Sequence, residues 1–315
     1  PRPGVFFDLE TALIETDRQL LANGITLAYL ALTISWEPGL RSLDSARKVI
    51  SALLHLRPRL LCDIRIQLRW EVFALDAVDQ VEAWLELDPK PTLAFNDHFT
   101  GLANGDRIRH KIPDYAARSG LTIDRYQKLL DDTKARAPDV EAAKKRLIAT
   151  AEQTGVVCFA HDEVSAETRR ENRALGITVS EFPLSESAAQ EARSNGEETV
   201  LGAPNVLRGG SHIGALDAEP AIREGLCTVL ASDYYYPSLL RAAYRLADGL
   251  PERLPSVWPT LASNAARAVG QRNRGAIEFG QRGDLVALRD GPDPCIVAVF
   301  RNGEPVYLTD AARLG

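Results

Sequence analysis

The chain has 315 residues, of which 45% are hydrophobic and 25% are charged. This balance is typical of a globular protein with enough apolar side chains for a sizeable core. The longest apolar runs are strand-sized and interrupted by charges, so the sequence predicts no membrane-spanning segment. A formal net charge of −6 argues against non-specific nucleic-acid binding, which needs a basic face, but it leaves room for a local basic pocket.

Short apolar runs alternate with helical stretches along the chain. In chain order, we expect strands at residues 25–32, 64–68, 91–95, 156–159, 177–180, 199–201 and 227–231. Apolar residues three and four apart predict intervening helices at 78–85, 121–135, 140–154, 170–175, 186–193, 221–224, 239–246 and 261–269. Such an alternation predicts a parallel sheet with crossover helices, and seven strands are all but one of a (β/α)8 barrel.

The last part of the chain has a different pattern. We expect short strands at 283–288, 296–301 and 305–308, the last two joined by Asn302-Gly303. Asn-Gly between apolar runs is a strong hairpin signal. The sequence therefore predicts two units, a barrel over residues 1–275 and part of a small β-sandwich module over residues 276–315.

Four polar residues stand where barrel strands are expected to end: Glu71, His98, His161 and Asp233. The carboxyl ends of the strands are where barrel enzymes build their active sites. Imidazole and carboxylate ligands that converge there suit a divalent metal ion, with zinc as the first choice. Such an ion would activate a water molecule. The alternative for each histidine taken alone is a hydrogen-bonded cap at a strand end.

A second signal is the segment 202–214, with glycines on both sides of Arg208 and of a Ser211-His212 pair. Glycines let backbone N–H groups approach a ligand, and arginine binds phosphate oxygens in a bidentate manner. The alternative is an ordinary long loop. His55 fits a structural role in a helical stretch, and His110 fits either a surface position or a phosphate-facing cluster.

The four cysteines are far apart and form no CxxC pair: Cys62, Cys158, Cys227 and Cys295. Isolated thiols within apolar strings are usually buried and reduced. This pattern favours a cytoplasmic protein.

Several motifs occur in one order along the chain: Pro1-Arg2-Pro3-Gly4-Val5, Asn96-Asp97-His98, His161-Asp162-Glu163, Glu181-Phe182-Pro183, the 202–214 segment and Ala231-Ser232-Asp233-Tyr234. Together they resemble the PhnM-type phosphonate-metabolism hydrolases of the amidohydrolase superfamily. The resemblance implies a metal-dependent (β/α)8 barrel with a small β-sandwich module. It also implies hydrolysis of a ribosyl-phosphonate triphosphate with release of pyrophosphate, as in the carbon–phosphorus lyase pathway.

The resemblance also implies roles for individual residues. Glu71, His98, His161 and Asp233 would be metal ligands, and Asp233 would also take the proton of the attacking water. Arg208 and His212 would bind phosphate groups, with Asn205 and Ser211 of the same segment beside them on the substrate. The expected cofactor is one or two divalent metal ions, zinc first, with manganese or iron as alternatives.

This family carries a His-x-Asp pair after its first strand, just upstream of the Pro-Arg-Pro-Gly segment. Here that segment opens the chain, and the chain contains no methionine. We therefore expect the first barrel strand, two ligands and part of the β module to belong to a longer parent protein.

Two rival functions stay open at this point. One is another amidohydrolase reaction, such as deacetylation or cyclic-amide hydrolysis. The other is a non-catalytic barrel that binds a ligand. The expected partners are a small phosphorylated substrate and a second copy of the chain in a homodimer, and neither nucleic acid nor a membrane is expected.

Overall fold

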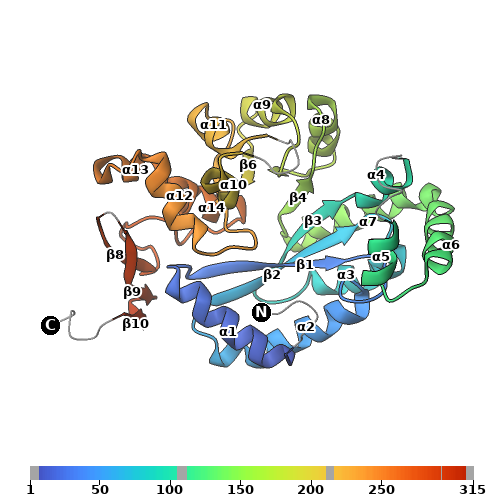
Figure 1. Ribbon diagram of the computed structural model, residues 1–315, viewed down its shortest axis with the longest axis horizontal. Helices are drawn as coiled ribbons and strands as arrows, with labels where there is room; N and C mark the ends of the chain where they lie inside the picture. Colours follow the sequence, from blue (N-terminus) through green and yellow to red (C-terminus); the bar gives the residue numbers. More distant parts are fainter. Residues whose placement is uncertain (1–6, 105–111, 211–215, 292, 310–315) are drawn as a thin grey trace.

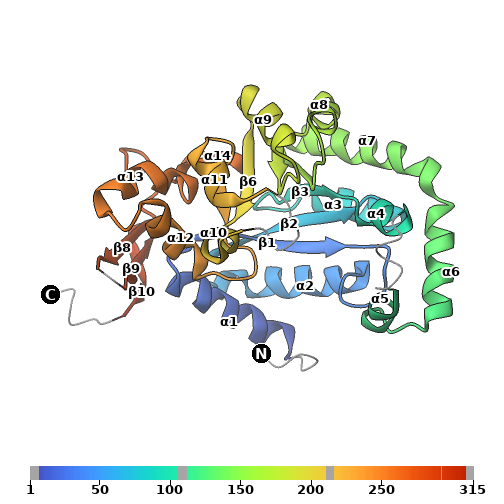
Figure 2. The same ribbon diagram turned by 45° about the horizontal axis from the view of Figure 1, so that its top comes forward.

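The computed structural model describes residues 7–104, 112–210, 216–291 and 293–309 (Figure 1). Its main feature is a sheet of seven parallel strands whose spatial order follows the chain. The strands are β1 (Leu27–Ile34), β2 (Asp63–Glu71), β3 (Thr92–Asn96), β4 (Cys158–His161), β5 (Val179–Glu181), β6 (Glu198–Gly202) and β7 (Val229–Ala231). The sheet curls, and helices cover its outer side (Figures 1 and 2). The predicted barrel fold is thereby confirmed, as seven strands of a TIM-like barrel.

Helices follow or precede these strands along the chain. Their bounds are α1 (Leu9–Ala22), α2 (Leu43–Leu56), α3 (Val78–Trp84), α4 (His98–Asn104), α5 (Ile112–Arg118), α6 (Ile123–Lys134), α7 (Ala137–Thr154), α8 (Ala166–Ala174), α9 (Glu186–Ser194), α10 (Ala203–Arg208), α11 (Ala218–Arg223), α12 (Ser238–Leu246), α13 (Leu254–Val257) and α14 (Ser263–Ala268). Serine or threonine caps begin several of them. Ser165, for example, accepts a hydrogen bond from the Thr168 N–H at the start of α8.

The two faces of β2 show how the sequence pattern positions the sheet. Ile64, Ile66, Leu68 and Trp70 are buried in the main hydrophobic core with residues of α1, α2 and α3. The alternate residues are all polar: Asp63, Arg65, Gln67, Arg69 and Glu71. Because side chains of a strand alternate between faces, these five point to the inner side of the curled sheet. The inner side is therefore polar along β2, from the amino end to the carboxyl end.

A second sheet is separate and antiparallel, with β9 (Cys295–Arg301) between β10 (Glu304–Leu308) and β8 (Leu285–Arg289). It lies at the end of the molecule away from α5 and α6 (Figure 1). Gly24, after α1, has a φ of +78° and allows a close approach, since an added Cβ would lie 3.0 Å from Ile296 Cδ1. Arg274, in the connection to β8, pairs with Asp63 at 3.1 Å and with Asp284 at 3.4 Å. The predicted boundary at residue 276 lies in this connection and stays a prediction.

Several helices of the structure lie outside the predicted ranges. We did not predict α1, α4, α5, α10 or α13, and of α2 only the stretch around His55 was expected to be helical. The most consequential is α10, because the 202–214 segment was expected to be a loop, and residues 203–208 are helical. Pro204 at the helix start and Gly209, with a φ of +76°, after its end explain how this short helix begins and stops.

No helix in the described part of the chain is both long and apolar enough to cross a membrane.

Candidate metal centre

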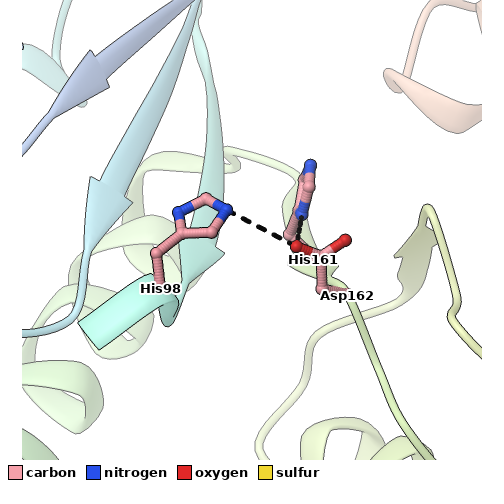
Figure 3. A group of neighbouring side chains, drawn as sticks. All are labelled: His98, His161 and Asp162. Carbon is pink, nitrogen blue, oxygen red and sulfur yellow. Dashed lines mark ion pairs between the residues drawn. The ribbon is translucent and has the colours of Figure 1, made fainter. Parts of the chain in front are cut away.

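Three side chains meet at the carboxyl edge of the parallel sheet: His98, His161 and Asp162 (Figure 3). His98 is the first residue of α4, just after β3, and His161 is the last residue of β4. The Asp162 carboxylate lies between the two rings, with Oδ2 3.0 Å from His161 Nδ1 and 3.5 Å from His98 Nε2. One donor atom from each residue lies within 4.8 Å of the others. The parallel direction of neighbouring strands brings them to one edge.

Asp162 is held in an unusual backbone conformation. Its φ is +60°, and Phe182 and Asp233 have φ values of +53° and +52°. Each of these non-glycine residues follows a strand of the sheet, β4, β5 and β7 respectively. Positive φ costs free energy outside glycine and is concentrated at functional sites. The strain therefore marks the carboxyl edge of the sheet as a site that the surrounding fold holds in place.

Glu163 anchors the turn that carries Asp162. Its carboxylate is almost completely buried and accepts hydrogen bonds from Ser180 Oγ at 2.5 Å, Asn172 Nδ2 at 2.8 Å and Arg169 Nη1 at 3.2 Å. The Leu184 N–H donates to the Glu163 carbonyl at 2.9 Å. These bonds fix the backbone on the far side of Asp162, so that its carboxylate is presented to the two histidines.

Glu71 orients His98 from the other side of the imidazole ring. Its buried carboxylate lies 2.6 Å from His98 Nδ1 and accepts the His98 backbone N–H at 3.2 Å. With Nδ1 held by Glu71, the other ring nitrogen, Nε2, faces Asp162. This is the arrangement by which a carboxylate fixes the orientation of a metal-binding histidine. The ligand role predicted for Glu71 stays a prediction, and the contacts shown here are to His98.

The charges of the site stabilise one another. Hydrogen bonds to Asp162 and Glu71 raise the pKa of His98 to about 9, against the opposing effect of burial. Burial alone would raise the pKa of Asp162, but its contacts with His161 and His98 hold it well below the ordinary value. Burial also acts to raise the pKa of Glu71, but its hydrogen bonds with His98 outweigh this effect and hold the pKa below the ordinary value. Both carboxylates are therefore negative at neutral pH.

These residues fit a divalent metal ion. Two imidazoles and a carboxylate are a donor set that zinc and related ions prefer. His161 Nδ1 is buried and faces the Asp162 carboxylate at 3.0 Å, so a metal-ligating nitrogen points to the centre of the group. The metal-ligand roles predicted for His98 and His161 are consistent with this geometry.

Asp233 lies further along the same edge, after β7, and its side chain is exposed. Its Oδ2 lies 3.6 Å from the point that a Cβ on Gly202 would occupy, and the Phe182 ring lies 3.5 Å from that point. The Phe182 ring is in turn 5.3 Å from the ring of His161. Phe182 therefore lies near both His161 and the end of β6 that Asp233 approaches. Within the described residues, Asp233 is not part of the group of three donors.

The residues predicted to bind substrate are only partly described. Asn205 is half-buried and lies on α10. Arg208 is exposed at the end of that helix, which follows β6 directly at the same edge of the sheet. Ser211, His212 and His110 lie outside the described residues. His55 is exposed on α2, where its Nε2 lies 4.0 Å from Glu10.

Two residues of the site escaped the sequence analysis, Asp162 and Arg69. Asp162 directly follows His161, and side chains of adjacent residues in an extended strand point to opposite faces of the sheet. The turn at Asp162, with its positive φ, places the carboxylate on the same side as the histidines. Arg69 stands two positions before Glu71 on the polar face of β2, and its Nη2 lies 2.9 Å from His161 Nε2. The strict polar alternation of β2 was a signal that could have found it.

No protein-family model matches the chain. The chain is 31% identical over 317 residues to the alpha-D-ribose 1-methylphosphonate 5-triphosphate diphosphatase of Escherichia coli (strain K12). That alignment covers 98% of this chain and 83% of the relative.

Two solved structures are similar to the chain in fold. A D-hydantoinase is 15% identical with a TM-score of 0.50, over 98% of this chain and 82% of the other. A guanine deaminase from C. acetobutylicum is 10% identical with a TM-score of 0.51, over 95% of this chain and 76% of the other. At these identities the likeness concerns the fold alone.

Proposed function

Since this chain belongs to the family of the alpha-D-ribose 1-methylphosphonate 5-triphosphate diphosphatases, we propose that it is a metal-dependent hydrolase that releases diphosphate from a ribosyl-phosphonate triphosphate. The observation that carries the proposal is the extent of the similarity. It covers 98% of the chain.

The geometry of the site supports a metal-dependent reaction. A divalent ion held by His98, His161 and Asp162 would supply acidification of a water molecule and polarisation of a phosphoryl oxygen. Glu71 keeps the ring of His98 oriented through Nδ1, at 2.6 Å. Glu163 keeps Asp162 in its strained turn through three side-chain hydrogen bonds. Both carboxylates act by holding other groups in place, which is the entropic part of catalysis.

Asp233 and α10 supply the remaining roles of the proposal. As a carboxylate on the same edge of the sheet, Asp233 is the proposed acceptor of the proton from the attacking water. Arg208 and Asn205 on α10, with Ser211 and His212 after it, are the proposed contacts of the phosphate chain. An arginine there would neutralise charge that develops during phosphoryl transfer.

The experiment is a ³¹P NMR assay of the metal-loaded protein with the ribosyl-phosphonate triphosphate. We expect stoichiometric diphosphate and the matching 5-phosphate. His98→Ala should abolish the reaction, and His55→Ala, a change of an exposed histidine on α2, should leave it intact. No diphosphate from wild type, or hydrolysis of hydantoins or N-acetyl amines instead, would overturn the proposal.

We also propose zinc as the resident metal, a cytoplasmic location and a place in the carbon–phosphorus lyase pathway. The nitrogen-rich donor set supports zinc over magnesium or calcium. All four cysteines are free, and burial raises the pKa of Cys158 and Cys227 to about 12, which leaves both unreactive. Metal analysis of protein purified without added metal tests the first point.

A further inference from the structure

Arg69 carries a guanidinium group that reaches the candidate metal-binding group from outside it. It projects from the inner face of β2, and its Nη2 lies 2.9 Å from His161 Nε2. His161 belongs to β4, two strands away, so the side chain of Arg69 must cross β3 to reach it.

The sequence of β3 makes this crossing possible. The residue of β3 in register with Arg69 is Ala94, a small buried side chain that points to the same inner face. A larger residue at that position would fill the path of the guanidinium group. Arg69 Nε is buried and has no hydrogen-bond partner in the described part of the chain. The guanidinium therefore has unused donor capacity, which is costly when buried.

The contact with His161 constrains where a metal ion can bind. A guanidinium group only donates hydrogen bonds, so His161 Nε2 must accept with its lone pair. A neutral imidazole has one such lone pair, and a metal ion needs it. If the ion binds at Nε2, it takes the place of Arg69. If it binds at Nδ1, the proton moves to Nε2, and two donors would then face each other. Metal binding by either nitrogen of His161 therefore breaks the bond to Arg69.

We propose that Arg69 exchanges between two partners: it caps His161 in the metal-free protein and binds a phosphoryl oxygen of the substrate once the metal ion is in place. This inference rests on the proposed function, because it assigns the phosphate chain as the second partner. Arginine suits that role, since its planar fork matches two oxygens of one phosphate group. A cation that has left His161 would also stand beside the metal ion, and an anionic ligand between them would offset their repulsion.

The exchange predicts opposite effects of one substitution on two affinities. The amide of Arg69→Gln is too short to reach across β3 to His161, so the metal ion no longer competes with a donor. Metal affinity of the metal-free variant, titrated with Zn²⁺ against a chromophoric chelator, should rise about tenfold. Affinity of the zinc-saturated variant for inorganic pyrophosphate, measured by calorimetry, should fall about 10- to 100-fold.

Two further variants control the interpretation. Arg69→Lys keeps the positive charge but not the fork, and should recover part of the pyrophosphate affinity. Arg65→Gln removes a guanidinium from the same face of β2, where it pairs with Asp63 at 3.0 Å, and should leave both affinities unchanged.

The outcomes separate this inference from the proposed function. Unchanged or weaker zinc binding by Arg69→Gln, or unchanged pyrophosphate binding, would overturn the exchange even if the wild type releases diphosphate. A wild type that fails to hydrolyse the triphosphate, with both affinities shifted in the expected directions, would overturn the proposed function and leave the exchange standing.

Discussion

Replacing Glu71 with glutamine tests whether a buried carboxylate prepares His98 for metal binding. Glutamine keeps the shape of the side chain and one acceptor oxygen, but it removes the negative charge. In the structure, two oxygens of Glu71 contact His98, one at Nδ1 and one at the backbone N–H. The single oxygen of glutamine can satisfy only one of these donors, so one bond is lost and the other is no longer charge-assisted.

The size of the effect follows from these contacts. A hydrogen bond to a buried charged group contributes about 1.5–3 kcal/mol, and each 1.4 kcal/mol corresponds to about a tenfold change in affinity. We therefore expect Glu71→Gln to weaken zinc binding about 10- to 100-fold, the range typical for residues that orient a metal ligand.

Competition with a chromophoric chelator measures the affinity, and metal analysis gives the stoichiometry. Glu198→Gln is the matched control, since Glu198 is also buried but begins β6, at the opposite edge of the sheet. It should bind zinc as wild type does. Wild-type affinity in Glu71→Gln would refute the reasoning. If the wild type binds two ions per chain and the variant binds one with unchanged affinity, Glu71 is itself a ligand of the ion that is lost.

Three other predictions follow from the same contacts. His98→Ala should retain less metal than wild type after gel filtration, by mass spectrometry, because one of three donors is gone; equal metal content would contradict this. Asp63→Asn should lower the free energy of unfolding in urea by about 3 kcal/mol, because Arg65 and Arg274 lose a partner. Burial acts to raise the pKa of Asp63, but Arg65 and Arg274 outweigh it and hold the pKa below the ordinary value. The wild type should therefore lose the stability that these ion pairs provide below about pH 4, where Asp63 becomes protonated, and the variant should show no such loss. Glu163→Gln should lower stability by about 1–3 kcal/mol and weaken zinc binding; unaltered zinc binding would show that Asp162 does not depend on this anchor.

The strands could be predicted from the sequence because their signal is local. Most are short apolar runs, β2 alternates apolar and polar residues, and β2 and β3 lie within three residues of their predicted bounds. The parallel order followed from the alternation with helices. Helices α1, α4 and α10 escaped because their apolar faces are short or mixed. In α10 the flanking glycines, read as loop residues, are the stop signals of a helix.

The site could be predicted only in part, for a geometric reason. A residue at the end of a parallel strand lies at one edge of the sheet, so His98 and His161 could be placed near each other without a structure. Which side chains then touch depends on backbone dihedrals and on the size of residues in register. Asp162 meets the histidines from a turn at positive φ, and Arg69 meets His161 across the small side chain of Ala94. Neither property follows from hydrophobic periodicity.

Polar residues stand at alternate positions of β2, from the amino edge of the parallel sheet to its carboxyl edge. At its amino end, Asp63 is committed to Arg65 and Arg274, and so ties the sheet to the β module. At its carboxyl end, Arg69 and Glu71 each contact one histidine. At the amino end, ion pairs within the chain tie the strand to the connection that leads to the small sheet. At the carboxyl end, both contacts are to histidines of the candidate metal-binding group. The strand therefore has a structural end and an end that faces the candidate site.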